Sequence, residues 1–405
     1  MKKLLLMTCA AAAYAAHATP PEIGNVQFKQ DENRLVTISY TLGGADAIVM
    51  MDVLTNGVSI GKALYANAAG DVNVRVKQGT RQILWQPRTT WPDQKIRDKS
   101  LSVKLTAWPL DNPPDYMCVD LVTKSNVVWY LNADDVPGGV TADIYKTDKL
   151  LMRRIHAEGI RWLMGLPKAG GTSDTWEPGH FVTLTNDYYM SIFEMTIGQC
   201  SRIVSGTTAS NGDYPDRSTS YEGLRGTTSG YDWPNDGHKV ADGSVLGALR
   251  RHAGINGFDL PTQAEWEYAA RAGNLGYCYY HWGFDTSKAA FEPYEWTSAT
   301  VSPSAAQKVG LLKPNAWGLY DMHGNCFERC LDWYAAGDTY SKHGSDVIAP
   351  PGPTMGTARV IHGGGYTHAS GPAYIFYREG YSPDASNDTN IGYRLACCAD
   401  FRDVQ

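Results

Sequence analysis

Alternation of apolar and polar residues dominates the first hundred positions of the chain. It is seen in residues 24–30, 35–42 and 102–108, and each run is bounded by Gly, Asn, Asp or Pro. A period of two indicates half-buried strands, and the bounding residues are typical of turns. Five to seven such strands predict a small β-sandwich of the immunoglobulin or fibronectin type over residues 19–112.

The apolar period changes from two to that of a helix after residue 260. Thr262 and Glu265 have the spacing of a capping box, in which each side chain accepts a backbone N–H of the other end. Apolar residues then follow at i, i+3, i+4 and i+7, at Trp266, Ala269, Ala270 and Gly273. This pattern predicts a helix that ends at Gly273–Asn274, with Trp266 as a packing residue rather than a binding residue.

A polar, proline-rich break at residues 111–115 marks a boundary between two domains. We expect residues 113–149 to be a linker with strands that lead into the second domain. Strand-like runs at 116–121 and 150–155 support this interpretation. The second domain is expected over residues 150–400, which gives the chain an α+β fold class.

The N-terminus has the layout of a secretory signal over residues 1–18, with two lysines, an apolar region and a small-x-small site before Thr19. A lipidated Cys9 is the alternative that this segment leaves open. We therefore expect a secreted, periplasmic or cell-surface protein. No other stretch is long and apolar enough to cross a bilayer, and a net charge of −6 gives no basic surface for nucleic acid.

Eight cysteines include Cys9, so an odd number would remain after cleavage, and at least one thiol would stay free or bridge to another chain. Cys326 and Cys330 lie four residues apart, but zinc would need two further ligands at suitable spacing. We expect most of the cysteines to act as small buried apolar residues.

Four segments carry a family resemblance: residues 260–273, 314–330, 359–365 and 391–395. In this order they resemble the formylglycine-generating enzyme (sulfatase-modifying factor) family, whose fold is a variant of the C-type-lectin fold. The resemblance extends over roughly 250 residues from position 150 onward. It implies a second domain that is rich in irregular loops.

The resemblance implies a structural calcium ion in the turn 321–328. Asp321 and Glu328 would supply side-chain oxygens, and Gly324 and Cys326 would supply carbonyl oxygens, the ligand type that calcium prefers. The alternative is a tight turn in which the two carboxylates only accept backbone N–H groups. Calcium avoids imidazole, so we expect His323 to be a surface or hydrogen-bonding residue.

The family's enzymes oxidise a substrate cysteine with copper held by two cysteines. In this sequence His368 and Ala373 stand at those two positions. Because both thiols are missing, copper and thiolate-based oxidation are not expected. Arg359, Arg378 and Arg394 match arginines that are usual in the family, and we expect them to tie loops together by hydrogen bonds.

The segment 365–390 is rich in Tyr, Ser, Asn, Asp, Thr and Gly, a composition typical of adaptable binding surfaces. The candidate ligand-binding residues are Tyr366, His368, Tyr374, Phe376, Tyr377, Tyr381 and Asn387. An irregular loop packed by its own aromatic side chains is the plainer interpretation. Within the lectin fold, proteins diversified by retroelements place variable residues in this part of the chain.

The expected function is that of a divergent, non-catalytic family member that binds a protein or glycan ligand. One alternative is a formylglycine-generating type of oxidoreductase with a non-standard active site. Another is a lectin-fold surface receptor diversified by retroelements.

Overall fold

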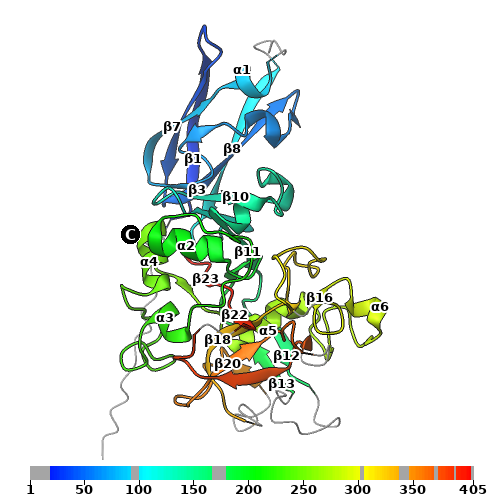
Figure 1. Cartoon of the computed structure of the whole chain (residues 1–405). Helices are drawn as coiled ribbons and strands as arrows, with labels where there is room; N and C mark the ends of the chain where they lie inside the picture. The colour runs from blue at the N-terminus through cyan, green and yellow to red at the C-terminus, as the bar shows by residue number, and fades with distance from the viewer. Residues whose placement is uncertain are drawn as a thin grey trace, which may run out of the picture. The chain divides into compact units, whose positions relative to one another are not determined.

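A computed structural model describes residues 19–92, 100–166, 179–301, 305–336, 346–368, 373–386 and 389–402. The chain divides into two compact units, Met1–Pro109 and Leu110–Gln405. Figure 1 shows the first unit in blue to cyan and the second in green to red. The signal expected at residues 1–18 lies outside the described residues.

The first unit consists of two antiparallel sheets. One has the strand order β1-β2-β7-β5, and the other has the order β4-β3-β6 with β8 paired to β3. The strands are β1 Glu22–Gln30, β2 Val36–Gly43, β3 Ala47–Thr55, β4 Val58–Ser59, β5 Ala69–Gly70, β6 Arg75–Val76, β7 Gly79–Trp85 and β8 Leu101–Pro109. Two short helices, η1 (Lys62–Tyr65) and α1 (Pro87–Thr90), lie in the connections.

The core of the first unit contains apolar residues from both sheets. Strand β2 buries every second residue, among them Ile38 and Tyr40, and β3 buries most of its length. Ile83 and Trp85 of β7 join the same cluster as Val49 of β3. The sandwich predicted from the alternating pattern is therefore confirmed, because two sheets share one apolar interior.

The second unit begins with a six-stranded sheet of order β10-β9-β11-β14-β23-β15. Its strands are β9 Tyr116–Asp120, β10 Val127–Tyr130, β11 Lys149–Ile155, β14 Tyr188–Ser191, β15 Phe258–Asp259 and β23 Ala396–Cys398. Strands β9 and β10 are thus part of this sheet, and the division between units falls at Pro109 and Leu110. Two short 3₁₀ helices, η2 (Ala133–Asp135) and η3 (Asp143–Lys146), connect β10 to β11.

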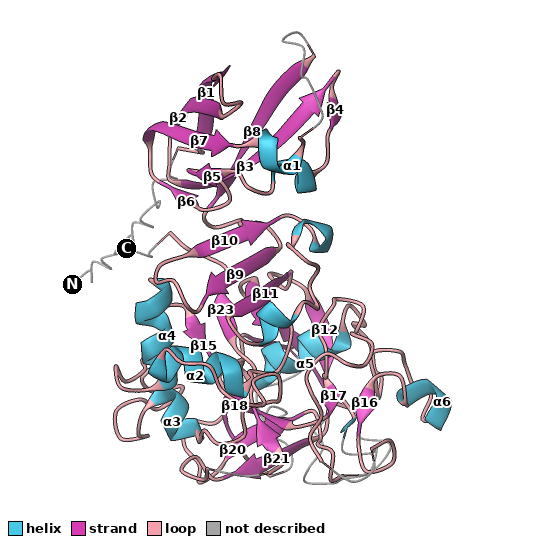
Figure 2. Cartoon of the chain, turned by 45° about the horizontal axis from the view of Figure 1, so that its top comes forward, coloured by secondary structure: helices cyan, strands magenta, loops and turns pink. Residues whose placement is uncertain are grey.

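Smaller sheets complete the second unit, as Figure 2 shows in magenta. One has the order β21-β20-β18-β22, another the order β12-β13-β19, and β16 pairs with β17. The strands are β12 Arg161–Met164, β13 His180–Thr183, β16 Glu295–Trp296, β17 His323–Gly324, β18 Phe327–Trp333, β19 Asp346–Ile348, β20 Arg359–His362, β21 Arg378–Tyr381 and β22 Ile391–Gly392.

The helices of the second unit are short. They are α2 Ile197–Ser205, α3 Tyr221–Arg225, α4 Val245–Ala253, α5 Gln263–Arg271 and α6 Lys288–Phe291. The predicted capping box is present at α5, where Thr262 Oγ1 accepts the N–H of Glu265 at 3.1 Å. The helix ends at Arg271, before the predicted stop, because Ala272 takes a left-handed conformation with φ of 48°. Gly273 therefore lies outside the apolar stripe.

Cysteines are distributed through the second unit as free thiols among the described residues. Five of them, Cys118, Cys278, Cys326, Cys330 and Cys397, are buried; Cys200 is half-buried and Cys398 is exposed. The expectation that most are small buried apolar residues is confirmed. Among the residues that the structure describes, no helix has the length and apolar character needed to span a membrane.

An exposed histidine links the starts of two strands to the end of a third. His156, which follows β11, places Nε2 3.1 Å from Asp115 Oδ1 and Nδ1 3.0 Å from Asp187 Oδ2. Hydrogen bonds to Asp115 and then to Asp187 raise the pKa of His156 to about 9. Both ring nitrogens can donate to the carboxylates at once only when the imidazole is protonated.

This linkage predicts a stability that depends on pH. The unfolded imidazole has a pKa of about 6.5, so the contribution of His156 is full below that pH and is lost as pH rises toward about 9. The variant His156→Gln should therefore melt at a lower temperature than the natural protein at pH 6, and the two should converge above pH 9. A melting difference that grows above pH 8 would contradict this assignment.

Candidate functional site

The turn 321–328, which contains β17 and the start of β18, includes three residues with left-handed backbone conformations. Asp321 has φ of 56°, Gly324 of 79° and Asn325 of 61°. At Gly324 a Cβ atom would lie 2.3 Å from the carbonyl oxygen of Trp296, so only glycine fits there. Buried Glu194 stabilises the turn by two hydrogen bonds. Its Oε1 accepts the N–H of Cys326 at 3.0 Å, and its Oε2 accepts a hydrogen bond from Asn325 Nδ2 at 2.5 Å.

Glu328 forms a buried ion pair with Arg394. Arg394 Nε donates to Glu328 Oε2 and Nη2 donates to Oε1, both at 2.6 Å. Trp266 Nε1 donates to the same carboxylate at 2.5 Å. Arg394 Nη1 and Nη2 also donate to the carbonyl oxygens of Ser191 and Tyr320 at 3.1 and 2.9 Å. The expected tying role of Arg394 is therefore confirmed.

The other two family arginines have the same role. Arg359 donates to the carbonyl oxygens of Trp233 and Leu331 at 2.9 and 2.7 Å and pairs with Asp232. Arg378 donates to the carbonyl oxygen of Ala335 at 3.1 Å. Because each guanidinium is fully buried, these bonds replace water contacts that burial removes.

The predicted calcium ligands are only partly available to a cation. Asp321 Oδ2 accepts the N–H of Gly310 at 2.7 Å, while the described residues offer the buried Oδ1 no hydrogen-bond partner. Burial raises the pKa of Asp321 to about 6, and it raises the pKa of the neighbouring Glu194 well above its ordinary value. The unpaired oxygen of Asp321 suits a hard cation. Glu328, in contrast, would have to leave Arg394 to act as a ligand.

The residues at the positions that resemble the family's copper cysteines carry no thiol. Ala373 has no ligating side-chain atom, and its carbonyl oxygen accepts the Nδ1–H of His323 at 2.8 Å. His368 Nδ1 lies 3.1 Å from Asn390 Nδ2 and 3.0 Å from Thr367 Oγ1. Two thiolates are what Cu(I) would need here, and neither position provides one.

A chain of hydrogen bonds starts at the Ala373 carbonyl and fixes the protonation of two histidines. A carbonyl oxygen only accepts, so His323 carries its hydrogen on Nδ1, and Nε2 of the neutral ring is an acceptor. His281 Nδ1 lies 3.1 Å from that Nε2 and must therefore donate. The remaining lone pair is then on Nε2 of half-buried His281, for which the described residues offer no partner.

Burial keeps both imidazoles neutral. It lowers the pKa of His281 to about 3 and that of His323 to about 4. His323 is thus a hydrogen-bonding residue, as expected, and it is buried rather than on the surface. The relay from Ala373 through His323 to His281 presents a hydrogen-bond acceptor with a fixed orientation and no charge.

Glu295 is a further buried group that sequence patterns did not indicate. It pairs in register with His323 across the two-stranded sheet of β16 and β17. Neither carboxylate oxygen has a hydrogen-bond partner among the described residues, and burial raises the pKa of Glu295 to about 8. The side chain is therefore largely protonated at neutral pH.

Aromatic side chains from three segments gather around the histidine relay. Tyr279 stacks on Tyr374 with ring centres 5.0 Å apart, and it forms a T-shaped pair with exposed Phe284 at 5.2 Å. Trp282 is stacked between buried Tyr280 at 4.2 Å and Tyr294 at 5.0 Å. We call the five partly exposed rings the aromatic surface: Tyr279, Trp282, Phe284, Tyr294 and Tyr374.

Sequence reasoning found only Tyr374 of the aromatic surface. The signal that could have revealed the rest is the density of aromatic residues in the stretch 277–284. Their partners Tyr294 and Tyr374 are distant in the chain. Local composition alone could not show that the three segments meet.

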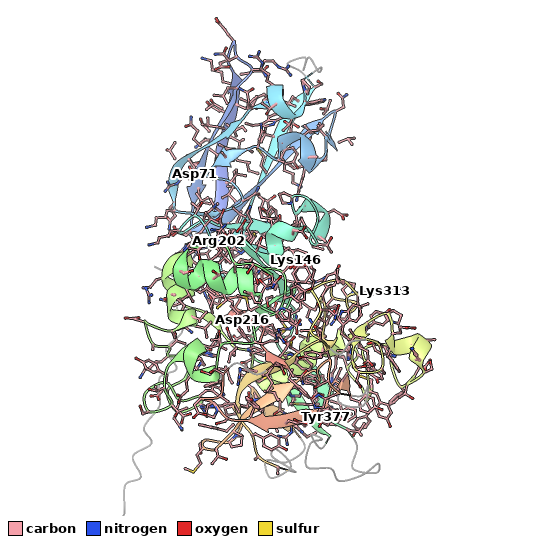
Figure 3. The ribbon with its side chains drawn as sticks, in the orientation of Figure 1. Asp71, Lys146, Arg202, Asp216, Lys313 and Tyr377 are labelled. Atoms are coloured by element: carbon pink, nitrogen blue, oxygen red, sulfur yellow. The ribbon has the colours of Figure 1, made fainter. Side chains whose placement is uncertain are left out.

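The other predicted ligand residues divide into packed and surface positions. Tyr366 and Phe376 are buried, and Tyr366 donates its hydroxyl hydrogen to the Thr389 carbonyl at 2.8 Å. Tyr377, labelled in Figure 3, is half-buried beside β21 and bonds Glu379. Tyr381 lies under the guanidinium of Arg329 at 5.2 Å. Asn387 lies outside the described residues.

Comparison with known proteins identifies the class of the second unit. A family model described as "Sulfatase-modifying factor enzyme 1-like domain" matches residues 153–399. The class is thus the one that includes formylglycine-generating enzymes. The chain belongs to the FGE-sulfatase family.

Curated relatives match a shorter part of the chain. The formylglycine-generating enzyme of Streptomyces coelicolor is 36% identical over 152 residues, which is 35% of this chain and 47% of that protein. The serine/threonine-protein kinase Pkn1 of Chlamydia trachomatis is 37% identical over 138 residues, which is 34% of this chain and 20% of that protein. The chain therefore spans less than half the length of these relatives.

Among solved structures, PvdO from Pseudomonas aeruginosa is similar with a TM-score of 0.49 and 22% identity, over 62% of this chain and 94% of that one. Treponema denticola variable protein 1 is similar with a TM-score of 0.46 and 23% identity, over 62% and 95%.

The unpaired oxygen of Asp321 leads to a prediction about calcium. If the turn binds the ion, adding calcium to chelator-treated protein should raise the melting temperature, because a ligand at 100 times its Kd stabilises the fold by about 2.7 kcal/mol. The variant Asp321→Ala should lose this response. Differential scanning calorimetry with and without calcium measures both.

A matched control is Asp213→Ala, which removes a carboxylate paired with Lys308 at the surface of the same unit. This variant should respond to calcium as the natural protein does. An identical melting temperature of the natural protein with chelator and with calcium would disprove calcium binding at the turn.

Proposed function

We propose that this protein is a non-catalytic member of the FGE-sulfatase family that binds a protein or glycan ligand through its second unit. The observation that carries the proposal is Ala373, which stands at a thiol position of the family and whose carbonyl oxygen accepts a hydrogen bond from His323. In this chain the position of a family thiol is therefore occupied by a residue whose backbone accepts a hydrogen bond from a neutral relay.

The state of the thiols and the end of the relay support binding rather than oxidation. Each of the seven described thiols is free, and burial raises the pKa of Cys326 and Cys330, the two in and after the turn, well above the ordinary value. A protonated buried thiol is a poor nucleophile and a poor metal ligand. The relay, in contrast, ends at His281 among partly exposed aromatic rings, a composition typical of binding surfaces.

Direct assay of the family reaction tests the absence of catalysis. The protein is incubated with copper and a peptide that contains Cys-x-Pro-x-Arg, and the peptide is analysed by mass spectrometry. We expect the cysteine to remain unchanged, while the Streptomyces coelicolor enzyme converts it under the same conditions. Loss of the thiol mass together with an aldehyde that reacts with a hydrazide probe would overturn the proposal in favour of an oxidoreductase with a different active site.

A further inference from the structure

The aromatic surface has an electrostatic character that restricts what it can bind. Aromatic rings carry negative faces and positive edges. Trp282 has both faces covered by Tyr280 and Tyr294, and Tyr279 and Tyr374 cover one face of each other. Trp282 therefore presents mainly its edge to a ligand, and Tyr279 and Tyr374 each have one face covered. Phe284 makes no stacked contact among the described residues and stays available to a sugar ring. Edges do not attract cations, in contrast to the open faces of an aromatic cage.

The aromatic surface offers few charged groups that could pair with a charged ligand. His281 and His323 bond to each other and to the Ala373 carbonyl, and among the described residues neither they nor Glu295 forms an ion pair. Among the described residues, no Lys or Arg lies over any ring of the aromatic surface, although ten such contacts occur elsewhere. Lys288, on the adjacent helix α6, lies 3.9 Å from Glu292. A sulfated or phosphorylated ligand would thus find no cation within the cluster.

Hydrogen-bonding groups at this surface favour a ligand rich in hydroxyl groups. His281 Nε2 is an acceptor of fixed orientation, because the relay commits Nδ1 to donation. Tyrosine hydroxyls of Tyr279, Tyr294 and Tyr374 can both donate and accept. A sugar hydroxyl can do the same, so it can donate to the imidazole and accept from a tyrosine.

The apolar part of the surface is small. Phe284 is its most exposed member, with 56% of its surface accessible. A stable protein interface buries about 800 Å² on each partner around an apolar centre. Five rings that mostly cover one another offer much less accessible apolar area. A ring of this exposure can instead contact the C–H face of a single sugar residue.

We infer that the aromatic surface binds a neutral oligosaccharide, with His281 Nε2 accepting a sugar hydroxyl and Phe284 packing against a pyranose ring. This inference rests on the proposed function and names its ligand class. A peptide that binds at the same residues would leave the proposed function standing and refute the sugar.

The test uses the whole chain and three neutral probes, cellohexaose, maltohexaose and chitohexaose, titrated by isothermal calorimetry. We expect at least one to bind. Phe284→Ala should weaken that binding about tenfold, as expected for the loss of a central aromatic contact. His281→Phe keeps an aromatic ring and removes the acceptor, and it should weaken binding about fivefold or more.

A control variant is Val204→Ala, which shortens a side chain that is 63% exposed on α2, away from the aromatic surface. Its affinity should equal that of the natural protein. Circular dichroism of each variant shows whether the fold is retained.

Several results would overturn the inference. The first is that none of the three neutral probes binds. The second is that a sulfated heparin hexasaccharide or choline binds more tightly than the neutral probes. The third is that Phe284→Ala and His281→Phe both bind the sugar with the affinity of the natural protein. If a library of neutral peptides binds and the sugars do not, the ligand is a peptide and the sugar assignment is wrong.

Discussion

The ion pair between Glu328 and Arg394 joins parts of the second unit that are far apart in the sequence. Its carboxylate lies on β18, its guanidinium lies just before β23, and the hydrogen bonds of the pair extend to α5, β14 and the carbonyl of Tyr320. Such a buried pair does not by itself guarantee stability. Removal of one partner nevertheless costs about 3–5 kcal/mol, because the other charge is left buried and alone.

The position of the candidate site depends on this pair. Glu328 and Tyr320 flank the turn that carries His323, so fixing both sides of the turn fixes where that imidazole meets Ala373. Glu194 holds the interior of the same turn through Asn325. The same framework therefore positions the relay from Ala373 through His323 to His281.

Sequence patterns predicted the features that depend on neighbouring residues in the chain. The capping box at Thr262 and Glu265 and the alternation of β2 depend on spacing along the chain. The tying role of Arg394 was expected from the family resemblance instead. The end of α5 was misplaced because Ala272, not a glycine, takes the left-handed position. Such a choice is made by packing around the helix end, which spacing does not encode.

The site was less accessible to prediction for a related reason. Tyr366 and Phe376 belong to a stretch whose composition is typical of binding loops, yet both are buried. Composition does not distinguish a ring that faces solvent from one that packs beneath it. Likewise, His281 and His323 are separated along the chain, and only the fold brings their ring nitrogens within 3.1 Å.

The distribution of thiols has a practical consequence. Among the described cysteines only Cys398 is exposed, whereas Cys200 is half-buried and the others are enclosed. Among these cysteines, a maleimide reagent under native conditions should therefore react first with Cys398, at the end of β23. Labelling there would place a fluorophore on the second unit without an engineered cysteine.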